Sequence, residues 1–210
     1  MRKANRILVI DNRDSFVYNI VEYLRRISGV EVDVVREGQG LSQGLSQEKD
    51  DIAGIVLSPG AGIPQEYRLM TALLKDPRTA GIPVLGVCLG MQAMTVATGG
   101  RLLQLGGPKH GHRSELYFTS EHNCSGAAMR PGILEDVPDG SHIGRYHSWV
   151  VDEATLPECW DIAGRDEDGN IMVIVHRSMP WTGVQFHPES IITGYGFRMI
   201  CNWVNGCTRV

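Results

Sequence analysis

The first half of the chain alternates between short apolar runs and longer stretches in which apolar residues recur at helical spacing. Residues 7–10, 30–35, 52–57 and 83–87 predict strands, and residues 15–27, 65–75 and 89–98 predict helices. Alternation of this kind favours a parallel sheet with helices on both faces. Ligands of such sheets bind beyond the carboxyl ends of the strands, so we expect the functional residues in the segments that follow strands.

The second half of the chain has a different pattern. Short β-type runs are separated by Gly, Pro and Asp, at residues 115–119, 149–152, 160–165, 171–176 and 181–186. Asp168-Gly169 between two of these runs is a hairpin signal, and residues 196–204 predict a final helix. Nothing resembles a domain linker, so we expect a single domain over residues 1–210. The predicted fold class is α/β: a mostly parallel twisted sheet flanked by helices, with an additional antiparallel β portion.

Composition argues against several classes of protein. The 210 residues carry a net charge of -4, which gives no general attraction to nucleic acid or to an anionic membrane. The apolar stretches are interrupted well short of the roughly 18 residues that a membrane span needs. The basic start is followed by too short an apolar run for a signal peptide. Five widely spaced cysteines without a CxxC pair indicate reduced thiols and a cytoplasmic location.

Gly86-Val87-Cys88-Leu89-Gly90 is the most informative segment, because a predicted strand runs into it and a predicted helix leaves it. Cys88 is therefore expected on a sharp strand-to-helix turn, with its thiol directed at solvent and facing a helix N-terminus that favours the thiolate. The backbone N–H of Leu89 is then placed to donate to an oxyanion. A small, buried apolar residue is the alternative interpretation of Cys88, and the spacing alone leaves both open.

A cysteine nucleophile needs a base, and the base needs a group that orients it. His187 follows a predicted strand, Pro188 ends that strand, and Glu189 lies two residues further on. In an extended segment His187 and Glu189 share one side, so Glu189 is predicted to hold the imidazole above the sheet edge. A strand end with a solvated carboxylate is the alternative, and the matching nucleophile segment decides against it.

Two further segments carry weaker signals. Residues 58–62 (Ser-Pro-Gly-Ala-Gly) follow a strand and predict a loop whose backbone N–H groups bind an anion or complete an oxyanion hole, with an ordinary turn as the alternative. The loop lacks the lysine of a P-loop, so no nucleotide is implied. His110, His112 and His122 suggest a metal site, but no Cys or carboxylate completes a tetrahedral set. We therefore expect neither a metal nor a cofactor.

Taken together, these segments resemble the class I, triad-type glutamine amidotransferases, in particular the small subunits of anthranilate synthase and aminodeoxychorismate synthase. The resemblance covers nearly the whole chain and rests on five collinear motifs, at residues 11–16 with Asn19, 57–64, 83–92, 145–149 and 183–190. The N-terminal motif discriminates best, because the other four recur in the amidotransferase domains of carbamoyl-phosphate and GMP synthetases.

The resemblance implies a role for each matching residue. Cys88 would be the nucleophile, His187 the general base and then acid, and Glu189 the carboxylate that orients it. Gly60 and Leu89 would supply the N–H groups of an oxyanion hole. The substrate-binding positions that the resemblance implies are Gly60, Ala61, Gly62, Gln92, Ser148 and Trp149, the last two in a glutamine-binding strand over residues 145–149.

Two departures from the family pattern affect these expectations. The family loop usually reads Pro-Gly-Pro-Gly, and Ala61 stands in place of the second proline, which predicts a less rigid loop. The His-Gly-Lys of the family appears here as residues 110–113, His-Gly-His-Arg, in a segment that faces the partner protein in relatives.

The reaction that the resemblance implies is hydrolysis of L-glutamine to L-glutamate and ammonia. The ammonia would pass to a partner, a chorismate-binding synthase subunit, with anthranilate synthesis favoured over aminodeoxychorismate synthesis. A stand-alone cysteine hydrolase and a non-catalytic interaction subunit are the rival interpretations. The His-Pro-Glu segment argues against the first, and the intact triad of Cys88, His187 and Glu189 argues against the second.

Overall fold

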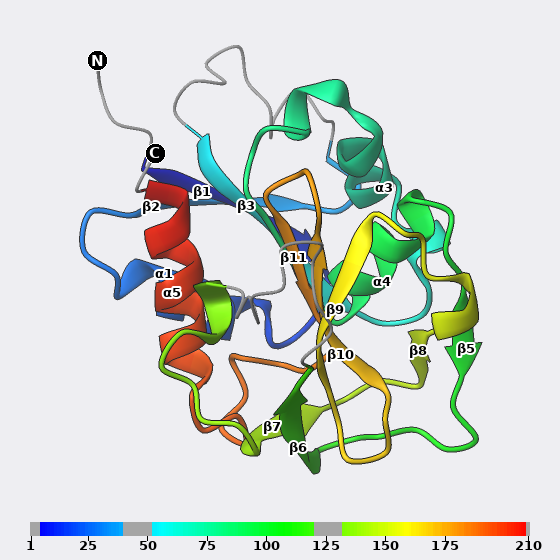
Figure 1. The fold of residues 1–210 in the computed structure, drawn as a ribbon. Helices are drawn as coiled ribbons and strands as arrows, with labels where there is room; N and C mark the ends of the chain where they lie inside the picture. The colour runs from blue at the N-terminus through cyan, green and yellow to red at the C-terminus, as the bar shows by residue number, and fades with distance from the viewer. Residues whose placement is uncertain (1–4, 40–51, 120–131, 209–210) are drawn as a thin grey trace.

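The computed structural model describes residues 5–39, 52–119 and 132–208 of the chain. At its centre lies one twisted sheet, which begins with a parallel part (Figure 1). The parallel strands are β1 Arg6–Asn12, β2 Glu31–Arg36, β3 Ile52–Gly60, β4 Val84–Val87 and β11 Trp181–Val184. They lie in the order β2-β1-β3-β4-β11, with neighbouring strands paired in parallel.

Antiparallel strands continue the same sheet beyond β11. They are β6 His112–Phe118, β7 Ser141–Arg145, β9 Trp160–Arg165 and β10 Ile171–His176, in the order β11-β10-β9-β6-β7. Gly169, at φ 84°, lies in the tight turn between β9 and β10 that the hairpin signal predicts. Two short strands, β5 Leu102–Gln104 and β8 Trp149–Val151, form a separate antiparallel pair. The predicted fold class is confirmed, with most of the antiparallel portion continuous with the parallel one.

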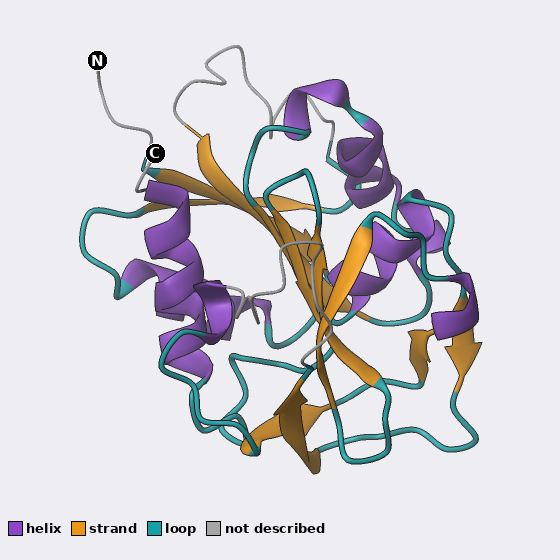
Figure 2. Cartoon of the chain, viewed as in Figure 1, coloured by secondary structure: helices purple, strands orange, loops and turns teal. Residues whose placement is uncertain are grey.

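Helices cover both faces of the parallel part of the sheet (Figure 2). On one face lie α1 Val17–Arg25 and α5 Gly196–Thr208, and on the other lie α3 Arg68–Lys75 and α4 Leu89–Ala97. The short 3-10 turns are η2 Pro64–Glu66, η3 Pro77–Thr79, η4 Gly132–Leu134 and η5 Glu153–Thr155. Within the described ranges, no helix is both long and apolar enough to cross a membrane.

The side chains of β1 divide the core into two layers, because successive residues of a strand point to opposite faces. Ile7 and Val9 pack in the layer that contains α1 and α5, whereas Leu8 and Ile10 pack in the layer that contains α3 and α4. All four side chains are at most 1% exposed. A continuous apolar run is therefore the sequence pattern of this strand, since both of its faces are buried.

The elements differ from the prediction at several places. The helix predicted over residues 65–75 begins as η2 and is interrupted at Tyr67, whose backbone is extended (φ -114°, ψ 95°). The strand predicted over residues 181–186 ends at Val184. β5 and β7 have no counterpart in the prediction, because they are too short or too polar to show an apolar alternation. His122 lies outside the described residues.

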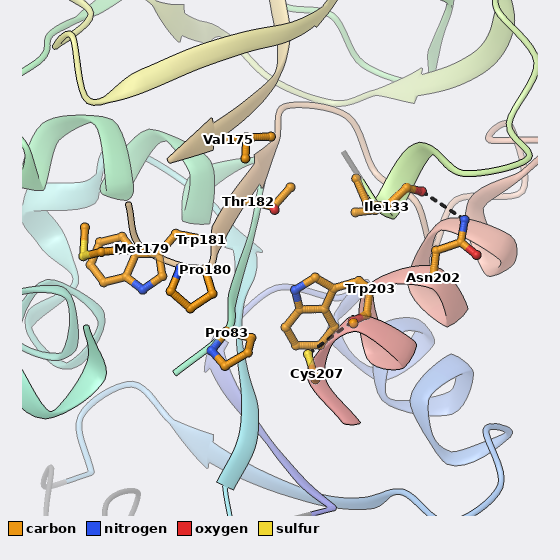
Figure 3. Close-up of a pocket in the computed structure, with 12 residues that line it drawn as sticks. Pro83, Ile133, Val175, Met179, Pro180, Trp181, Thr182, Asn202, Trp203 and Cys207 are labelled. Carbon is orange, nitrogen blue, oxygen red and sulfur yellow. Dashed lines mark hydrogen bonds between the residues drawn. The ribbon is translucent and has the colours of Figure 1, made fainter. Parts of the chain in front are cut away.

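A cavity of about 210 Å³ opens at the amino ends of β4 and β11, beside α5 (Figure 3). Pro83, Trp181 and Trp203 give it an apolar lining, to which Cys207 also contributes. Burial raises the pKa of the Cys207 thiol to about 12, so this thiol stays protonated at neutral pH. The cavity lies at the opposite end of the parallel strands from Cys88, which follows the carboxyl end of β4.

Candidate active site

Four neighbouring parallel strands bring the predicted catalytic residues into one region. Asn12 ends β1, Gly60 ends β3, Cys88 directly follows β4, and His187 lies three residues beyond β11. Because β4 lies between β3 and β11, Cys88 lies between the loop after Gly60 and the segment of His187. The carboxyl ends of the strands, where ligands of parallel sheets bind, therefore hold the site.

Cys88 lies on the sharp turn that the sequence predicts. Its backbone has φ 51° and ψ -100°, in a region that residues with a Cβ rarely adopt. The turn needs glycine on both sides: a Cβ at Gly86 would come within 2.6 Å of Gly90, and one at Gly90 within 2.3 Å of the Leu57 carbonyl oxygen. The thiol is less open than predicted, because Cys88 is only 5% exposed and lines a cavity rather than facing bulk solvent.

His187 and Glu189 are in direct contact, with 2.7 Å between Nδ1 and Oε1. The sequence predicts an extended segment here, but the chain turns at Pro188. The N–H of Ser190 donates to the carbonyl of His187 at 3.1 Å and closes this turn. This turn folds the carboxylate back to the ring, and the fixed φ of proline suits its second position. Both side chains are at most 3% exposed, so the contact is shielded from water.

The backbone and ring of His187 are held from several sides. Its N–H donates to the carbonyl of Gly144 at 2.9 Å, and its carbonyl accepts from the hydroxyl of Thr193 at 2.6 Å. Phe16 and Tyr146 pack edge-on against the imidazole, with ring centroids 5.8 and 4.9 Å away. Phe16 belongs to the N-terminal motif, and this contact places that motif at the site.

The pKa of His187 is raised well above its ordinary value. Burial lowers this pKa, but hydrogen bonding and charge interactions with Cys88 and Glu189 together outweigh the burial. Glu189 contacts Nδ1 of the ring, and among the described residues Nε2 makes no hydrogen bond of standard geometry. A raised pKa favours the imidazolium, which is the form that stabilises a neighbouring thiolate.

Side chains from β1 and from the turn before α3 hold the loop after β3. Asn12 Nδ2 donates to the carbonyl of Ser58 at 2.8 Å, and the hydroxyl of Tyr67 donates to the carbonyl of Ala61 at 2.7 Å. Ser58 lies within β3, so the first bond fixes the end of that strand. The second bond fixes the loop at Ala61, where the sequence predicts less rigidity. A Cβ at Gly60 would come within 2.5 Å of the Leu89 side chain, so the two predicted oxyanion donors belong to segments in contact.

A cavity of about 340 Å³ is lined by Cys88 and by residues from the surrounding loops. Every predicted substrate-binding position contributes to it: Gly60, Ala61, Gly62, Gln92, Ser148 and Trp149. Gln104, His110, Tyr146 and His147 also line the cavity. Tyr146 and His147 belong to the predicted glutamine-binding segment at residues 145–149, whereas Gln104 and His110 had no predicted substrate role. The structure thus brings the predicted residues together, while the role of each stays a prediction.

Residues 146–148 form a loop between β7 and β8, where the sequence predicts a glutamine-binding strand. Neighbouring backbone holds this loop in place. The N–H of Leu105 donates to the carbonyl of Ser148 at 2.8 Å, and the N–H of Lys109 donates to the carbonyl of His147 at 3.0 Å. The first of these bonds continues the pairing of β5 with β8, and the second joins the loop to Lys109, beyond the end of β5.

A buried ion pair lies next to this loop. Arg145 and Asp166 are in contact, and both side chains are 0% exposed. Arg145 Nε also donates to Nε2 of His147 at 3.1 Å. Burial, and then the positive charge of Arg145, lower the pKa of His147 to about 3, so His147 is neutral at neutral pH. Arg145 belongs to the motif at residues 145–149, but the sequence reasoning missed its burial and its partner Asp166, because a charged residue at a strand end gives no sign of being buried.

Gln185 is a further residue that the sequence reasoning missed. Its side chain is fully buried between β11 and His187, and its Nε2 lies 3.6 Å from Sγ of Cys88. The signal in the sequence is a single polar residue in an otherwise apolar run, Val184-Gln185-Phe186. Buried polar side chains of this kind need partners, so such a residue marks a place where a hydrogen-bond network is required.

The described part of the chain contains no group of three His, Cys, Asp or Glu side chains that could hold a metal ion. Of the histidines that suggest a metal site in the sequence, His110 lines the cavity over Cys88. His112 is exposed at the start of β6.

An α/β sheet that carries a cysteine on a strained strand-to-helix turn, beside a buried histidine–glutamate pair, defines the class of α/β proteins built around a nucleophile elbow. Within that class the chain belongs to the family described as "Glutamine amidotransferase class-I", which matches residues 8–207.

Similar proteins cover nearly the whole chain. The anthranilate synthase component 2 of Azospirillum brasilense is 37% identical, over 97% of this chain and 97% of that protein. The aminodeoxychorismate synthase component 2 of Klebsiella aerogenes is 36% identical, over 95% of this chain and 99% of that protein. The crystal structure of a candidate GMP synthase protein from Thermoplasma acidophilum has a TM-score of 0.80 at 23% identity, covering 99% of this chain and 96% of that one. This last likeness shows the fold.

Proposed function

We propose that this chain hydrolyses L-glutamine to L-glutamate and ammonia, with Cys88 as the nucleophile, His187 as the proton carrier and Glu189 as the group that orients the imidazole. One observation carries the proposal. A cysteine on a nucleophile elbow lies beside a buried histidine whose pKa is raised by that cysteine and by Glu189. A thiolate–imidazolium pair is the reactive form of such a site, and membership of the amidotransferase family supplies the reaction class.

In the first half of the reaction, the Cys88 thiolate attacks the side-chain carbonyl carbon of glutamine. The backbone N–H groups of Gly60 and Leu89 stabilise the oxyanion that forms on the carbonyl oxygen. The imidazolium of His187 gives its proton to the departing nitrogen, the C–N bond breaks, and ammonia leaves a thioester on Cys88. Glu189 stabilises the positive charge of the ring and keeps the proton of Nδ1 in place.

In the second half, water attacks the thioester carbon. His187, now neutral, takes one proton from this water, and the C–S bond breaks to release L-glutamate and the Cys88 thiolate. The same imidazole thus acts as acid and then as base. Burial of His187 keeps other water away from the proton that it carries.

The cavity over Cys88 would hold the α-amino and α-carboxylate groups of glutamine. Both N–H groups of the Gln92 side chain are used inside the protein, one by the carbonyl of Trp149 and one by Oε1 of Gln185. Gln92 is one of the residues that line the cavity, and its side-chain oxygen would accept a bond from the α-ammonium group. Backbone groups of Ser148 and Trp149 would bind the rest of the amino-acid end.

We further propose that the ammonia passes to a chorismate-binding synthase subunit, as component 2 of an anthranilate synthase. Relatives named for the two syntheses are 37% and 36% identical, so the glutaminase subunit of an aminodeoxychorismate synthase is the alternative. The described cysteines are free, which supports the reduced, cytoplasmic location expected from the sequence. Mixing the chain with each type of synthase subunit, and identifying the product formed from chorismate and glutamine, decides between the two pathways.

A glutamine analogue with a diazoketone in place of the amide tests the glutaminase proposal. We expect mass spectrometry to find the label on Cys88, with L-glutamine protecting that position and L-asparagine failing to protect it. Labelling of Cys201, which is half-buried on α5, serves as the internal control. If Cys201 or Cys159 reacts before Cys88, Cys88 is not the nucleophile.

A further inference from the structure

We infer that Gln185 donates a hydrogen bond to the Cys88 thiolate, and that the carbonyl of Trp149 sets the orientation of this donor through Gln92. This inference deepens the proposed function and rests on it, since it concerns the sulfur that attacks glutamine. Nε2 of Gln185 lies 3.6 Å from Sγ of Cys88, and Oε1 of Gln185 lies 3.2 Å from Nε2 of Gln92. Gln185 therefore contacts the reacting atom and is a catalytic residue of the site.

The direction of this chain of bonds follows from its far end. The backbone carbonyl of Trp149 can only accept, so the side chain of Gln92 must present its nitrogen there, at 2.9 Å. The same nitrogen also faces Gln185, which must present its oxygen to Gln92. The nitrogen of Gln185 is then left to face Cys88. A reversed amide at either glutamine would oppose two donors or two acceptors inside the protein.

Burial of the two glutamine side chains strengthens these hydrogen bonds. Gln185 is 0% exposed and Gln92 is 2% exposed, so water does not compete for these bonds. The backbone N–H of Gln185 also donates to the carbonyl of Met172 on β10 at 2.8 Å, which fixes the residue from the neighbouring strand. An amide N–H binds a thiolate more strongly than a thiol, so the contact favours the charged, nucleophilic form of Cys88.

The chain of bonds also connects the nucleophile to the substrate cavity. Gln92 and Trp149 line that cavity, whereas Gln185 is buried beneath them. A displacement of the Trp149 carbonyl would remove the acceptor that holds Gln92, and the amide of Gln185 would lose the partner that orients it. A change in the conformation of the loop that precedes Trp149 would therefore change the hydrogen bond to the Cys88 sulfur.

The test measures alkylation of Cys88 by iodoacetamide against pH, with each cysteine followed by mass spectrometry. The titratable side chains around this thiol are His187, with Glu189 against it, and His110, Tyr146 and His147 of the cavity lining. All of these stay unchanged in the variants below, so a change in the profile reports on the amides.

Gln185→Met removes the donor and keeps the length of the side chain. We expect the Cys88 alkylation rate near pH 7 to fall about tenfold and the midpoint of the profile to move up by about one to two pH units, as for loss of a charge-assisted hydrogen bond. Gln65→Met makes the same change at an exposed position that does not line the cavity and should leave the profile unchanged. Gln92→Met should move the midpoint in the same direction by a smaller amount, because Gln185 keeps its amide but loses its orienting partner.

Gln185→Leu covers the case in which Gln185→Met fails to fold, since it fills a similar volume and adds no titratable group. Its side chain cannot donate, so the midpoint should again move up. A profile of either folded Gln185 variant that superimposes on those of the wild type and Gln65→Met would overturn the inference. Failure of the glutamine analogue to label Cys88 would instead reject the proposed function, and the two outcomes are read from separate experiments.

Discussion

Nδ1 of His187 lies 2.7 Å from Oε1 of Glu189, and the turn at Pro188 brings the two side chains together. If Glu189 orients the imidazole and stabilises its charge, loss of His187 and loss of Glu189 should both slow glutamine hydrolysis, but by different factors. His187→Asn removes the proton carrier from both halves of the reaction, so turnover should fall by several orders of magnitude. Glu189→Gln leaves the imidazole in place, and its loss should be smaller, about one to three decades.

Side-by-side turnover numbers of the wild type and both variants check this prediction. Glu22→Gln, at an exposed position on α1, makes the same change outside the site and should leave turnover unaltered. Wild-type turnover in Glu189→Gln would mean that the carboxylate has no role in the reaction and that the triad is a Cys–His dyad.

The raised pKa of His187 also predicts how stability depends on pH. A histidine whose pKa is higher in the folded than in the unfolded chain stabilises the fold fully below its unfolded pKa of about 6.5. This contribution is lost as the pH rises through the raised folded value. Because Glu189 is one cause of the raised pKa, Glu189→Gln should lose more unfolding free energy at about pH 6 than at about pH 9.

Urea denaturation of the wild type and Glu189→Gln across this pH range measures the difference, with Glu22→Gln as the matched control. A loss of stability in Glu189→Gln that is constant with pH, or that grows towards alkaline pH, would show that the carboxylate does not hold the imidazolium.

Gly60 offers a test of the oxyanion loop. A Cβ at this position would come within 2.5 Å of the Leu89 side chain and within 3.0 Å of Asn12 Cβ, so Gly60→Ala must shift the loop or the buried Leu89 side chain against it. Turnover should fall by about 10²–10³-fold, as it does when an oxyanion donor is lost. Iodoacetamide, which needs no oxyanion hole, should still alkylate Cys88 at a rate close to that of the wild type.

Gly81→Ala is the control for this substitution, because nothing lies within 4 Å of a Cβ at Gly81. Thermal unfolding of both variants separates loss of catalysis from loss of fold. A Gly60→Ala protein that folds and turns over glutamine like the wild type would remove the loop from the mechanism.

The parallel half of the sheet and the place of Cys88 could be predicted from the sequence because local signals specify them. The apolar run around Val9 marks a strand buried on both faces, and the glycines beside Cys88 mark a tight turn. The strand predicted over residues 145–149 is wrong for residues 146–148. Arg145 ends a strand, but the residues after it form a loop. The backbone of this loop is hydrogen-bonded to a segment about 40 positions earlier in the chain, and the local pattern of apolar residues does not indicate such a contact.

The partners of the site residues were also beyond sequence reasoning. Gln185 reaches Cys88 across 97 positions of the chain, and Phe16 contacts His187 from the opposite end of the sequence. Contacts of this kind depend on the order of strands in the sheet, and the sequence contains no direct signal for that order. Glu189 was placed beside His187 correctly, although the expected extended segment is a turn.

In the proposed reaction, Cys88 releases ammonia from glutamine for use by a synthase partner. The most direct measurement is product formation from chorismate by the chain reconstituted with its synthase partner, with either L-glutamine or an ammonium salt as the nitrogen source. We predict that Cys88→Ala abolishes the glutamine-dependent reaction and leaves the ammonium-dependent reaction at the wild-type rate, while Cys201→Ala alters neither. Equal loss of both reactions in Cys88→Ala, or continued use of glutamine, would contradict the account.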